Sequence, residues 1–257
     1  MSYFRKVKAM LFLTNLIGIT GILFFFSWWG LFTALAVWVV VNVGLSAGFH
    51  RLFAHRSYKT NRFWWWFLLI AGTLASVGSS ISWVGQHRQH HSKSDVEGSD
   101  PYYPHNGFLK AWVLGPWPSP ILPMTVKDLI RDKNHKWLHD NYFKVIAGYV
   151  VALALINPEL VIWVWAVPGA MAFFSLQMTG VFGHMIGKQV HPTDDKSMDC
   201  HFLNLFTFGE SYQNTHHYRP RQVITGLFDV SGYLITYIFK KEERDVPQYK
   251  SKGTSGC

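Results

Sequence analysis

Four apolar stretches constrain the fold of this chain most strongly, because a helix of about 20 apolar residues, within a range near 17 to 25, is long enough to cross a lipid bilayer. The stretches are residues 9–28, 31–49, 142–156 and 160–182. The third is short and contains Lys144 near its start. The sequence therefore predicts an all-α integral membrane protein with four transmembrane helices.

A fifth apolar run, residues 63–84, is interrupted by several glycine and serine residues. It contains the cluster Trp64-Trp65-Trp66, and tryptophan is enriched at the boundary between lipid and water. We expect this run to form one or two interfacial helices that lie along the membrane rather than cross it.

The composition supports a chain that has lipid as part of its solvent. Of the 257 residues, 49% are hydrophobic, 17% are aromatic and only 15% are charged, against about 25% charged residues in an ordinary soluble domain. The only cysteines are Cys200 and Cys257, which argues against a disulfide scaffold and fits a reduced, cytosol-facing location.

The distribution of basic residues predicts the orientation in the membrane. The turns between the first and second spans and between the third and fourth spans contain no Lys or Arg. By the positive-inside rule, both termini lie in the cytosol, and residues 50–141 and 183–257 form a cytosolic cap. The net charge of +9 would attract anionic lipid headgroups or an acidic protein. Nucleic acid is not expected as a partner, and we find no internal repeat, so residues 1–257 are predicted to form one domain.

Histidine is concentrated in short clusters on the cytosolic side of this arrangement. His87, His90 and His91 are spaced so that all three project from one face of a helix. His216 and His217 form a second cluster, while His50 and His55 are five residues apart, roughly 140° around an ideal helix. That pair can serve one site only if the helix ends or bends between them. A single histidine of this kind could equally be a hydrogen-bonding residue at a helix end.

The clusters together predict a metal site. Many imidazoles without a nearby cysteine thiolate suit iron, zinc, copper or nickel rather than calcium or magnesium. Eight histidines exceed the three or four that a zinc site normally uses, so we expect two metal ions. A metal transporter is the alternative from another class of protein, but it predicts ionisable residues inside the spans, and the four spans are nearly free of them.

At these residues the chain resembles a known family. The segments HRLFAH at 50–55, QHRQHH at 86–91 and QNTHH at 213–217 resemble the three histidine boxes of membrane fatty-acid desaturases of the stearoyl-CoA and acyl-lipid Δ9 type. The resemblance covers residues 30 to 220 approximately, and the combined spacing of the boxes is highly specific.

The resemblance implies a di-iron centre at the cytosolic end of a four-helix bundle, which uses O₂ to introduce a cis double bond into a saturated acyl chain, with Δ9 as the expected position. A membrane di-iron hydroxylase is the alternative, because it would share the boxes. By motif position, the expected iron ligands are His50, His55, His87, His90, His91, His184, His216 and His217.

Two positions depart from the family pattern. Gln213 replaces the first histidine of the usual H-x-x-H-H box, and Gly180 stands where the family tends to have Asn. Gln213 could be a weak ligand, or water could complete that iron, and His201 could compensate. Carboxylates usually hold the outer ring N–H of ligand histidines. The candidates for this role are Asp95, Asp100 and Glu210, with solvated loop acids as the alternative.

The acyl carrier and the electron donor are less constrained. Acyl-CoA desaturases commonly have an Arg-Asp pair just before the second box, where this chain has Gly85-Gln86, so we favour an acyl-lipid substrate, with acyl-CoA as the alternative. Lys59, Arg62 and Arg88 could contact the headgroup or anchor the chain at the membrane surface. No iron-sulfur motif is present, which implies an external ferredoxin or cytochrome b5-like donor.

Overall fold

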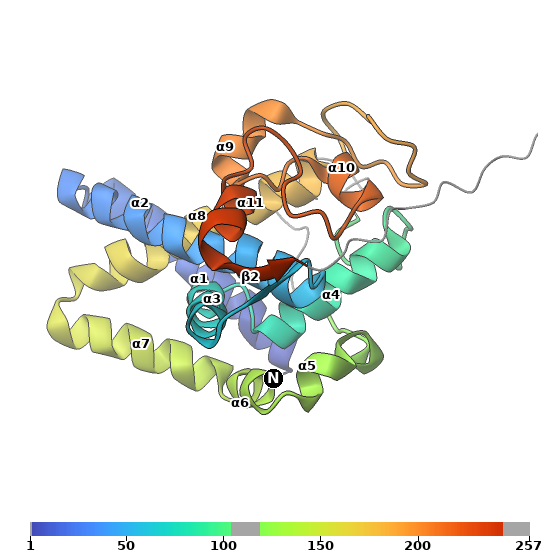
Figure 1. Cartoon of the computed structure of the whole chain (residues 1–257). Coiled ribbons are helices and arrows are strands. Elements are labelled where there is room, and N and C mark those ends of the chain that lie inside the picture. Colours follow the sequence, from blue (N-terminus) through green and yellow to red (C-terminus); the bar gives the residue numbers. More distant parts are fainter. Residues whose placement is uncertain (1, 104–118, 244–257) are drawn as a thin grey trace, which may run out of the picture.

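The computed structural model describes residues 2–103 and 119–243, and these are mostly helical (Figure 1). Helix α1, Tyr3–Phe24, is separated by three residues from α2, Trp28–Val43. The side chain of Ser27 accepts a hydrogen bond from the Gly30 backbone N–H at 3.0 Å and so caps the start of α2. The predicted boundary between the first two spans is therefore wrong by a few residues, because α1 ends at Phe24 and α2 begins at Trp28.

The second long helix continues past the predicted end at residue 49. From Gly44 to Ala54 it becomes the π-helix η1. Glycine is required at position 44, since a Cβ atom there would lie 2.2 Å from the backbone nitrogen of Gly72. That close approach packs η1 against α3, Arg62–Leu74.

The run 63–84 forms parts of two helices, α3 and α4, Ser80–Lys93. Between them, Ser76 and Gly78 have left-handed backbone conformations, with φ of 62° and 113°, and Ser79 caps α4 by accepting a hydrogen bond from Ser82 N–H. The break at residues 75–79 turns the chain so that α4 carries the second histidine box toward η1.

A group of shorter helices follows residue 119. The 3₁₀ helix η4, Pro123–Val126, and α5, Lys127–Arg131, pack near α4, and α6, Lys133–Asp140, leads into α7, Tyr142–Ile156. Helix α7 has 15 residues, so it is about 22 Å long, shorter than the roughly 30 Å of a bilayer core. A full transmembrane span over residues 142–156 thus stays a prediction.

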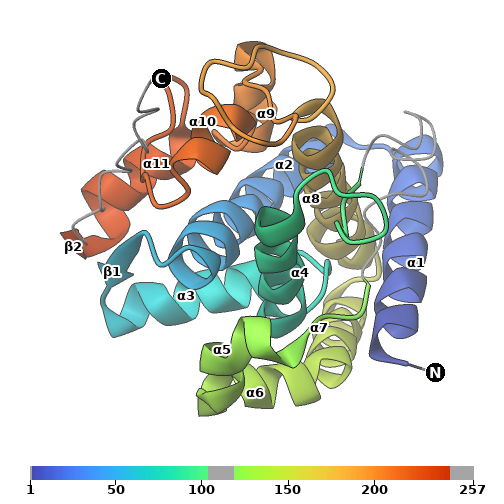
Figure 2. The same ribbon diagram turned by 90° about the vertical axis from the view of Figure 1, so that its right-hand side faces the viewer.

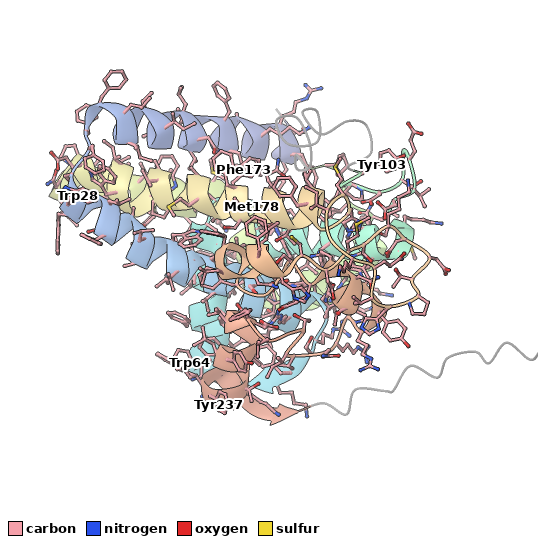
Figure 3. All side chains as sticks on the ribbon, turned by 90° about the horizontal axis from the view of Figure 1, so that it is seen from above. Trp28, Trp64, Tyr103, Phe173, Met178 and Tyr237 are labelled. Atoms are coloured by element: carbon pink, nitrogen blue, oxygen red, sulfur yellow. The ribbon has the colours of Figure 1, made fainter. Side chains whose placement is uncertain are left out.

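A third long helix packs between the first two. It consists of the π-helix η5, Val161–Ala166, then α8, Val167–Gln177, and the π-helix η6, Met178–Phe182, and it contacts both α1 and α2. In the described residues, three helices are long and apolar enough to cross a membrane, at Tyr3–Phe24, Trp28–Ala54 and Val161–Phe182. Figure 3 shows Trp28 at one end of this bundle and Tyr103 toward the other.

The C-terminal part of the described chain, from residue 201, lies along one side of the bundle near this end (Figure 2). It contains the 3₁₀ helix η7, His201–Leu203, then α9, Asn204–Thr207, α10, Gln213–Tyr218, α11, Val230–Leu234, and the π-helix η8, Ile235–Phe239. Strand β2, Lys240–Glu243, pairs antiparallel with β1, Tyr58–Thr60. This small sheet is a correction to the all-α prediction, and it ties the C-terminal segment to the residues that follow the first histidine box.

Candidate metal centre

All eight histidines named as expected ligands come together, in two groups. The five-imidazole cluster consists of His50, His55, His87, His91 and His216, and the three-imidazole cluster consists of His90, His184 and His217. Within each group, one ring nitrogen from every residue lies within 4.8 Å of the others. Elements far apart in sequence, η1, α4, the turn after η6 and α10, meet at this point.

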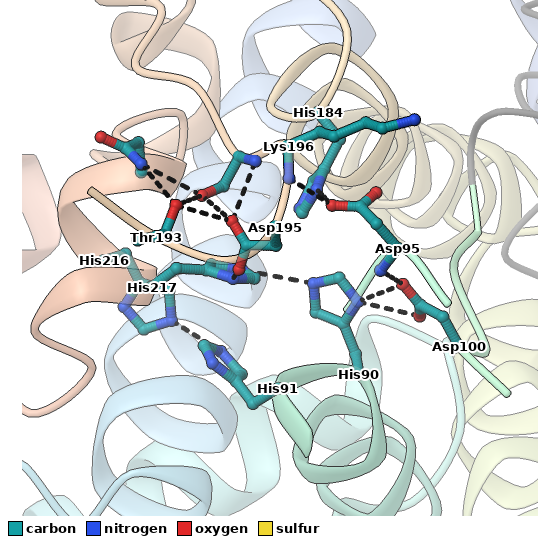
Figure 4. A network of polar contacts seen from close by, with 12 residues as sticks. His90, His91, Asp95, Asp100, His184, Thr193, Asp195, Lys196, His216 and His217 are labelled. Atoms are coloured by element: carbon teal, nitrogen blue, oxygen red, sulfur yellow. Dashed lines mark hydrogen bonds and ion pairs between the residues drawn. The ribbon is translucent and has the colours of Figure 1, made fainter. Parts of the chain in front are cut away.

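The two clusters share the helices that supply them. On α4, His87 and His91 are four residues apart and face the first cluster, whereas His90 belongs to the second. On α10, the neighbouring residues His216 and His217 are divided in the same way, as Figure 4 shows. Each of these helices therefore lies between two potential metal positions.

The first box enters the five-imidazole cluster through the π-helix. The backbone N–H of His55 donates to the carbonyl oxygen of His50 at 3.0 Å, the i to i+5 bond of a π-helix. This bond brings the two rings to a centroid separation of 4.8 Å. The sequence required the helix to end or bend between them, and the π-helical turn is the local solution.

Ring nitrogens in the five-imidazole cluster point at one another. The Nε2 atoms of His55 and His87 are 2.7 Å apart, and Nε2 of His216 lies 3.0 Å from both His50 and His91. Burial, reinforced by neighbouring histidines, lowers the pKa of His55, His87, His91 and His216 well below its usual value. These rings are therefore neutral at physiological pH, the form in which imidazole binds a metal.

In the three-imidazole cluster each ring is held by a carboxylate. Nδ1 of His90 lies 2.9 Å from a carboxylate oxygen of Asp100. The corresponding distances are 3.0 Å from His184 to Asp95 and 2.6 Å from His217 to Asp195 (Figure 4). Because an ionised carboxylate only accepts hydrogen bonds, these contacts place a proton on Nδ1 and leave the Nε2 lone pair free in the neutral ring.

This cluster has the donor arrangement that a cation requires. The Nε2 atoms of His90 and His217 lie 3.3 Å apart, and two lone pairs at that distance cannot hydrogen-bond to each other. The Nε2 atom of His184 is buried and has no hydrogen-bond partner among the described residues, an arrangement that is costly unless something binds it. Converging, unprotonated imidazole nitrogens therefore fit a metal ion.

Asp195 was not among the carboxylates named from the sequence. It lies in the loop between His184 and the third box, and it accepts hydrogen bonds from the Ser197 N–H at 3.0 Å and from Thr193. Burial opposes its charge, but the interactions with His217 and the hydrogen bonds from Ser197 together outweigh burial and lower the pKa of Asp195. Burial likewise lowers the pKa of His217 to about 4, against the opposing effect of Asp195. The only sequence signal was an aspartate pair at 194–195 in a polar loop.

Glu210, a named candidate, belongs to a buried network around the first box. Its carboxylate lies 2.5 Å from Nδ1 of His50 and 3.3 Å from Nη2 of Arg51, and it accepts a hydrogen bond from Ser46. Arg51 is 2% exposed and also donates to Asp229 at 2.8 Å. The buried guanidinium is thus paired with two carboxylates, which link the first box to the C-terminal segment.

The three residues suggested for the headgroup lie in different surroundings. Arg88 is fully engaged: its guanidinium donates to the carbonyl oxygens of Phe53, Ala54 and Thr125 and to both carboxylate oxygens of Asp128. Lys59 and Arg62 are exposed on β1 and at the start of α3. The contacts of Arg88 indicate that it holds the first and second boxes together.

The remaining candidates lie outside the clusters. The side-chain N–H of Gln213 donates to the Glu210 carbonyl oxygen at 2.8 Å. His201 is exposed, and its ring packs 5.1 Å from that of Tyr212. Gly180 lines a cavity, and among the described residues no atom outside its chain neighbours and the backbone of its own helix lies within 4 Å of where its Cβ would be.

An apolar cavity ends at the two clusters. Its empty volume is about 920 Å³, which includes the part that is open to solvent. Leu11 of α1, Leu45 of η1, and Phe173 and Leu176 of α8 line it. His50, His87 and His90 line its other end. The arrangement can place a long apolar chain beside two metal positions.

Comparisons with known proteins agree with this geometry. The sn-1 stearoyl-lipid 9-desaturase of Anabaena variabilis is 33% identical over 202 residues, which cover 75% of this chain and 72% of that protein. The corresponding enzyme of Synechocystis sp. is 32% identical over 199 residues, 75% of this chain and 62% of that protein. Delta-9 acyl-lipid desaturase 1 of Arabidopsis thaliana is 29% identical over 231 residues, 84% and 74% of the two chains. The family model for fatty acid desaturases matches residues 26–249, and this chain therefore belongs to the fatty acid desaturase family.

Proposed function

We propose that this desaturase uses two iron ions and O₂ to introduce a cis Δ9 double bond into a saturated acyl chain carried by a membrane lipid. The observation that carries the proposal is the position of the two histidine clusters at the end of an apolar cavity. Residues of the first, second and third boxes all contribute to the clusters, so the reacting carbons would lie beside both metals.

Each cluster would hold one iron. His50, His55, His87, His91 and His216 would bind the first, and His90, His184 and His217 would bind the second. An alkyl C–H bond is not acidic, so acid–base groups alone cannot break it and a redox-active group is needed, which excludes zinc as the working metal because zinc has no redox chemistry. When bound, the irons supply oxidation by O₂: two hydrogens leave the acyl chain, two electrons come from the donor, and two water molecules form with two further protons.

The protein's own residues would orient the ligands and position the chain. Asp95, Asp100 and Asp195 fix which nitrogen of their histidine carries the proton. Glu210, 2.5 Å from Nδ1 of His50, would orient that ring. The apolar wall formed by Leu45, Phe173 and Leu176 would exclude water from the reacting carbons and hold the chain extended.

A lipid carrier is supported by the relatives, whose names describe desaturases of lipid-borne stearoyl chains. Gln86, at the place where a nucleotide-binding pair would be expected, is buried and turned inward. Its side-chain N–H donates to Ser82 O at 3.2 Å, and its oxygen accepts from Ser119 N at 3.3 Å. It is therefore occupied within the protein rather than available to a headgroup.

The proposal includes a multi-pass topology with both termini and the metal centre in the cytosol, and an external electron donor of the ferredoxin or cytochrome b5 type. The net charge of +9 would attract an acidic donor, with an association rate that falls as salt rises.

Product analysis tests the proposal. A host that expresses the protein should accumulate cis-9 monoenoic chains, detected by gas chromatography with mass spectrometry, and the variants His90→Ala and His216→Ala should not produce them. Purified protein in nanodiscs, supplied with O₂ and with reduced ferredoxin or cytochrome b5, should act on stearoyl chains supplied as lipid but not as acyl-CoA, and should contain two irons per chain. A hydroxylated product would instead establish the hydroxylase, and turnover of acyl-CoA alone would overturn the lipid carrier.

A further inference from the structure

Three large apolar side chains are exposed on the segment formed by η7 and α9. Phe202 is 75% exposed, Leu205 68% and Phe206 47%. They occupy positions i, i+3 and i+4 and therefore lie on one face, while Leu203, between them, and Thr207, directly after them, are buried. A face of this kind on a protein in water would be unusual and marks an interaction surface.

The contacts of α9 place this face beside the membrane-spanning helices. The hydroxyl of Ser175 donates to the carbonyl oxygen of Phe206 at 3.1 Å, and the Trp38 indole N–H lies 3.3 Å from the same hydroxyl. The ring of Phe208 packs edge-on to Trp38 at 5.3 Å. Figures 1 and 2 both show α9 beside α8.

These contacts also give the depth of the segment. Ser175 lies in the spanning helix Val161–Phe182, seven residues before its end, which corresponds to about 10 Å along the helix axis. Trp38 lies within the other spanning helix, Trp28–Ala54. Residues that the sequence assigned to the cytosolic cap, 183–257, therefore include a segment at the level of the apolar helices.

Hydrogen bonds within the protein lower the cost of placing this segment at the depth of the lipid acyl chains. The Gly209 N–H donates to the Asn204 carbonyl oxygen at 3.2 Å, and the Cys200 N–H donates to Ser211 O at 2.9 Å. The Thr207 hydroxyl donates to Leu203 O at 3.1 Å. These hydrogen bonds lower the cost of placing the segment in hydrocarbon, where unpaired backbone groups are costly.

The opposite side of the same segment reaches the cavity. Thr207 is buried and lines the apolar cavity together with Asn42 and Ser175. The exposed side chains of α2 at this level, Val39 and Val40, are each 42% exposed, so the apolar face of α9 continues the lipid-facing surface of a spanning helix.

We propose that η7 and α9 are embedded in the cytosolic leaflet, where Phe202, Leu205 and Phe206 contact lipid acyl chains and Thr207 faces the cavity. The segment is then the wall that separates leaflet lipid from the cavity. Its lipid contact is independent of the reaction, whereas the statement that the cavity behind it holds an acyl chain rests on the proposed function.

Site-directed spin labelling tests the lipid contact. In a Cys200→Ala, Cys257→Ala background in nanodiscs, a nitroxide is attached to Phe202→Cys or Leu205→Cys. Phe12→Cys, on α1 and 65% exposed, is the control for lipid, and Val190→Cys, on a cap loop and 51% exposed, is the control for water. Relaxation by lipid-soluble O₂ should exceed relaxation by a water-soluble nickel complex at 202, 205 and 12, with the reverse at 190.

Relaxation dominated by nickel at both 202 and 205 in protein that elutes as a folded species would overturn the lipid contact. For the wall, Thr207→Phe should lower turnover of lipid-borne stearoyl chains at least tenfold, while Leu205→Phe, on the exposed face of the same segment and outside the cavity lining, should retain it. Equal turnover in both variants would overturn the wall. If the wild type shows no turnover at all, the proposed function and the wall fail together, but the spin-label result on lipid contact still holds.

Discussion

The two histidine clusters solve the same problem by different means. In the five-imidazole cluster, the rings are held mainly by packing against neighbouring rings, and the ring of His87 stacks on that of Trp83 at 5.0 Å. Among the described residues of this cluster, only His50 has a carboxylate at its Nδ1. In the three-imidazole cluster every ring has its own carboxylate, from Asp95, Asp100 or Asp195. A cluster with many ligands can depend on packing, whereas a cluster with few ligands depends on the orientation of each.

This difference predicts unequal tolerance to ligand loss, and it is the largest effect that we expect. His184→Ala leaves two imidazoles in its cluster, while His91→Ala leaves four in the other. We expect His184→Ala to retain about half of the metal and to lose more than 100-fold in activity, whereas His91→Ala retains nearly all of the metal. Metal analysis of purified protein together with fatty acid analysis measures both.

In this experiment each of the two histidine variants is the control for the other. Equal metal loss in His184→Ala and His91→Ala would contradict the comparison, since it would mean that the two clusters bind as one unit.

The carboxylates give the second effect. Loss of a group that orients a metal ligand typically costs 10–100-fold in metal affinity, so we expect a loss in that range for Asp195→Asn. Glu210→Gln should cost less, because four other imidazoles remain in that cluster. Competition with a chelator measures the affinities.

The matched control for Asp195→Asn is Asp194→Asn, at the exposed neighbouring position. A larger loss of metal affinity in Glu210→Gln than in Asp195→Asn would contradict the difference that we infer between the two clusters.

The same comparison shows what the sequence could predict. Spacing within one element is local, so the histidines of each box, and the approach of all the boxes to one place, follow from the motifs and the predicted spans. The division into clusters does not follow, because His216 and His217 are adjacent in sequence and yet face different groups. Only the tertiary positions of η1 and the turn after η6 decide which ring meets which.

Other features depended on contacts that leave no pattern in the sequence. The π-helix that aligns His50 with His55 begins at Gly44, where the backbone packs closely against Gly72, and the residues alone do not reveal it. Asp195 reaches His217 across 22 positions from an irregular loop. Arg88 was considered for the headgroup because it is basic and close to the membrane, but its contacts are with Asp128 and backbone carbonyls.

The third effect concerns the support of the five-imidazole cluster by Arg88. Its guanidinium binds the carbonyl oxygens of Phe53 and Ala54, just before His55, and Asp128. Lysine keeps the charge but cannot make these parallel contacts. We expect Arg88→Lys to destabilise the fold by about 1–3 kcal/mol, measured as a lower midpoint of thermal inactivation in detergent.

Arg62→Lys, at an exposed position on α3, is the matched control and should leave the midpoint unchanged.

The ion pair between Arg88 and Asp128 should also make the stability depend on pH. Burial opposes the charge of Asp128, but hydrogen bonds from Arg88 and Arg56 outweigh it and lower the pKa of the carboxyl. Since the folded pKa is below the unfolded value near 4, the contribution is complete above that pH and is lost as the pH falls further. An unchanged midpoint in Arg88→Lys at neutral pH would show that the contacts of Arg88 do not stabilise the five-imidazole cluster.

The smallest effect should come from Gln213, because it would add a ligand to the weaker cluster rather than remove one. Gln213 lies on α10 one turn before His217, and a Cβ on Gly183, next to His184, would lie only 2.3 Å from its Cγ, so its side chain is already beside the three-imidazole cluster. Gln213→His should raise the retention of metal during dialysis against chelator by a few-fold, on the order of 1 kcal/mol, and keep activity within a similar factor. Gln213→Leu, which offers no ligand atom, is the control. If Gln213→His abolishes activity while Gln213→Leu retains it, the added imidazole blocks a position that must stay open, and the smaller number of ligands in this cluster would then be a requirement of the reaction rather than a weakness.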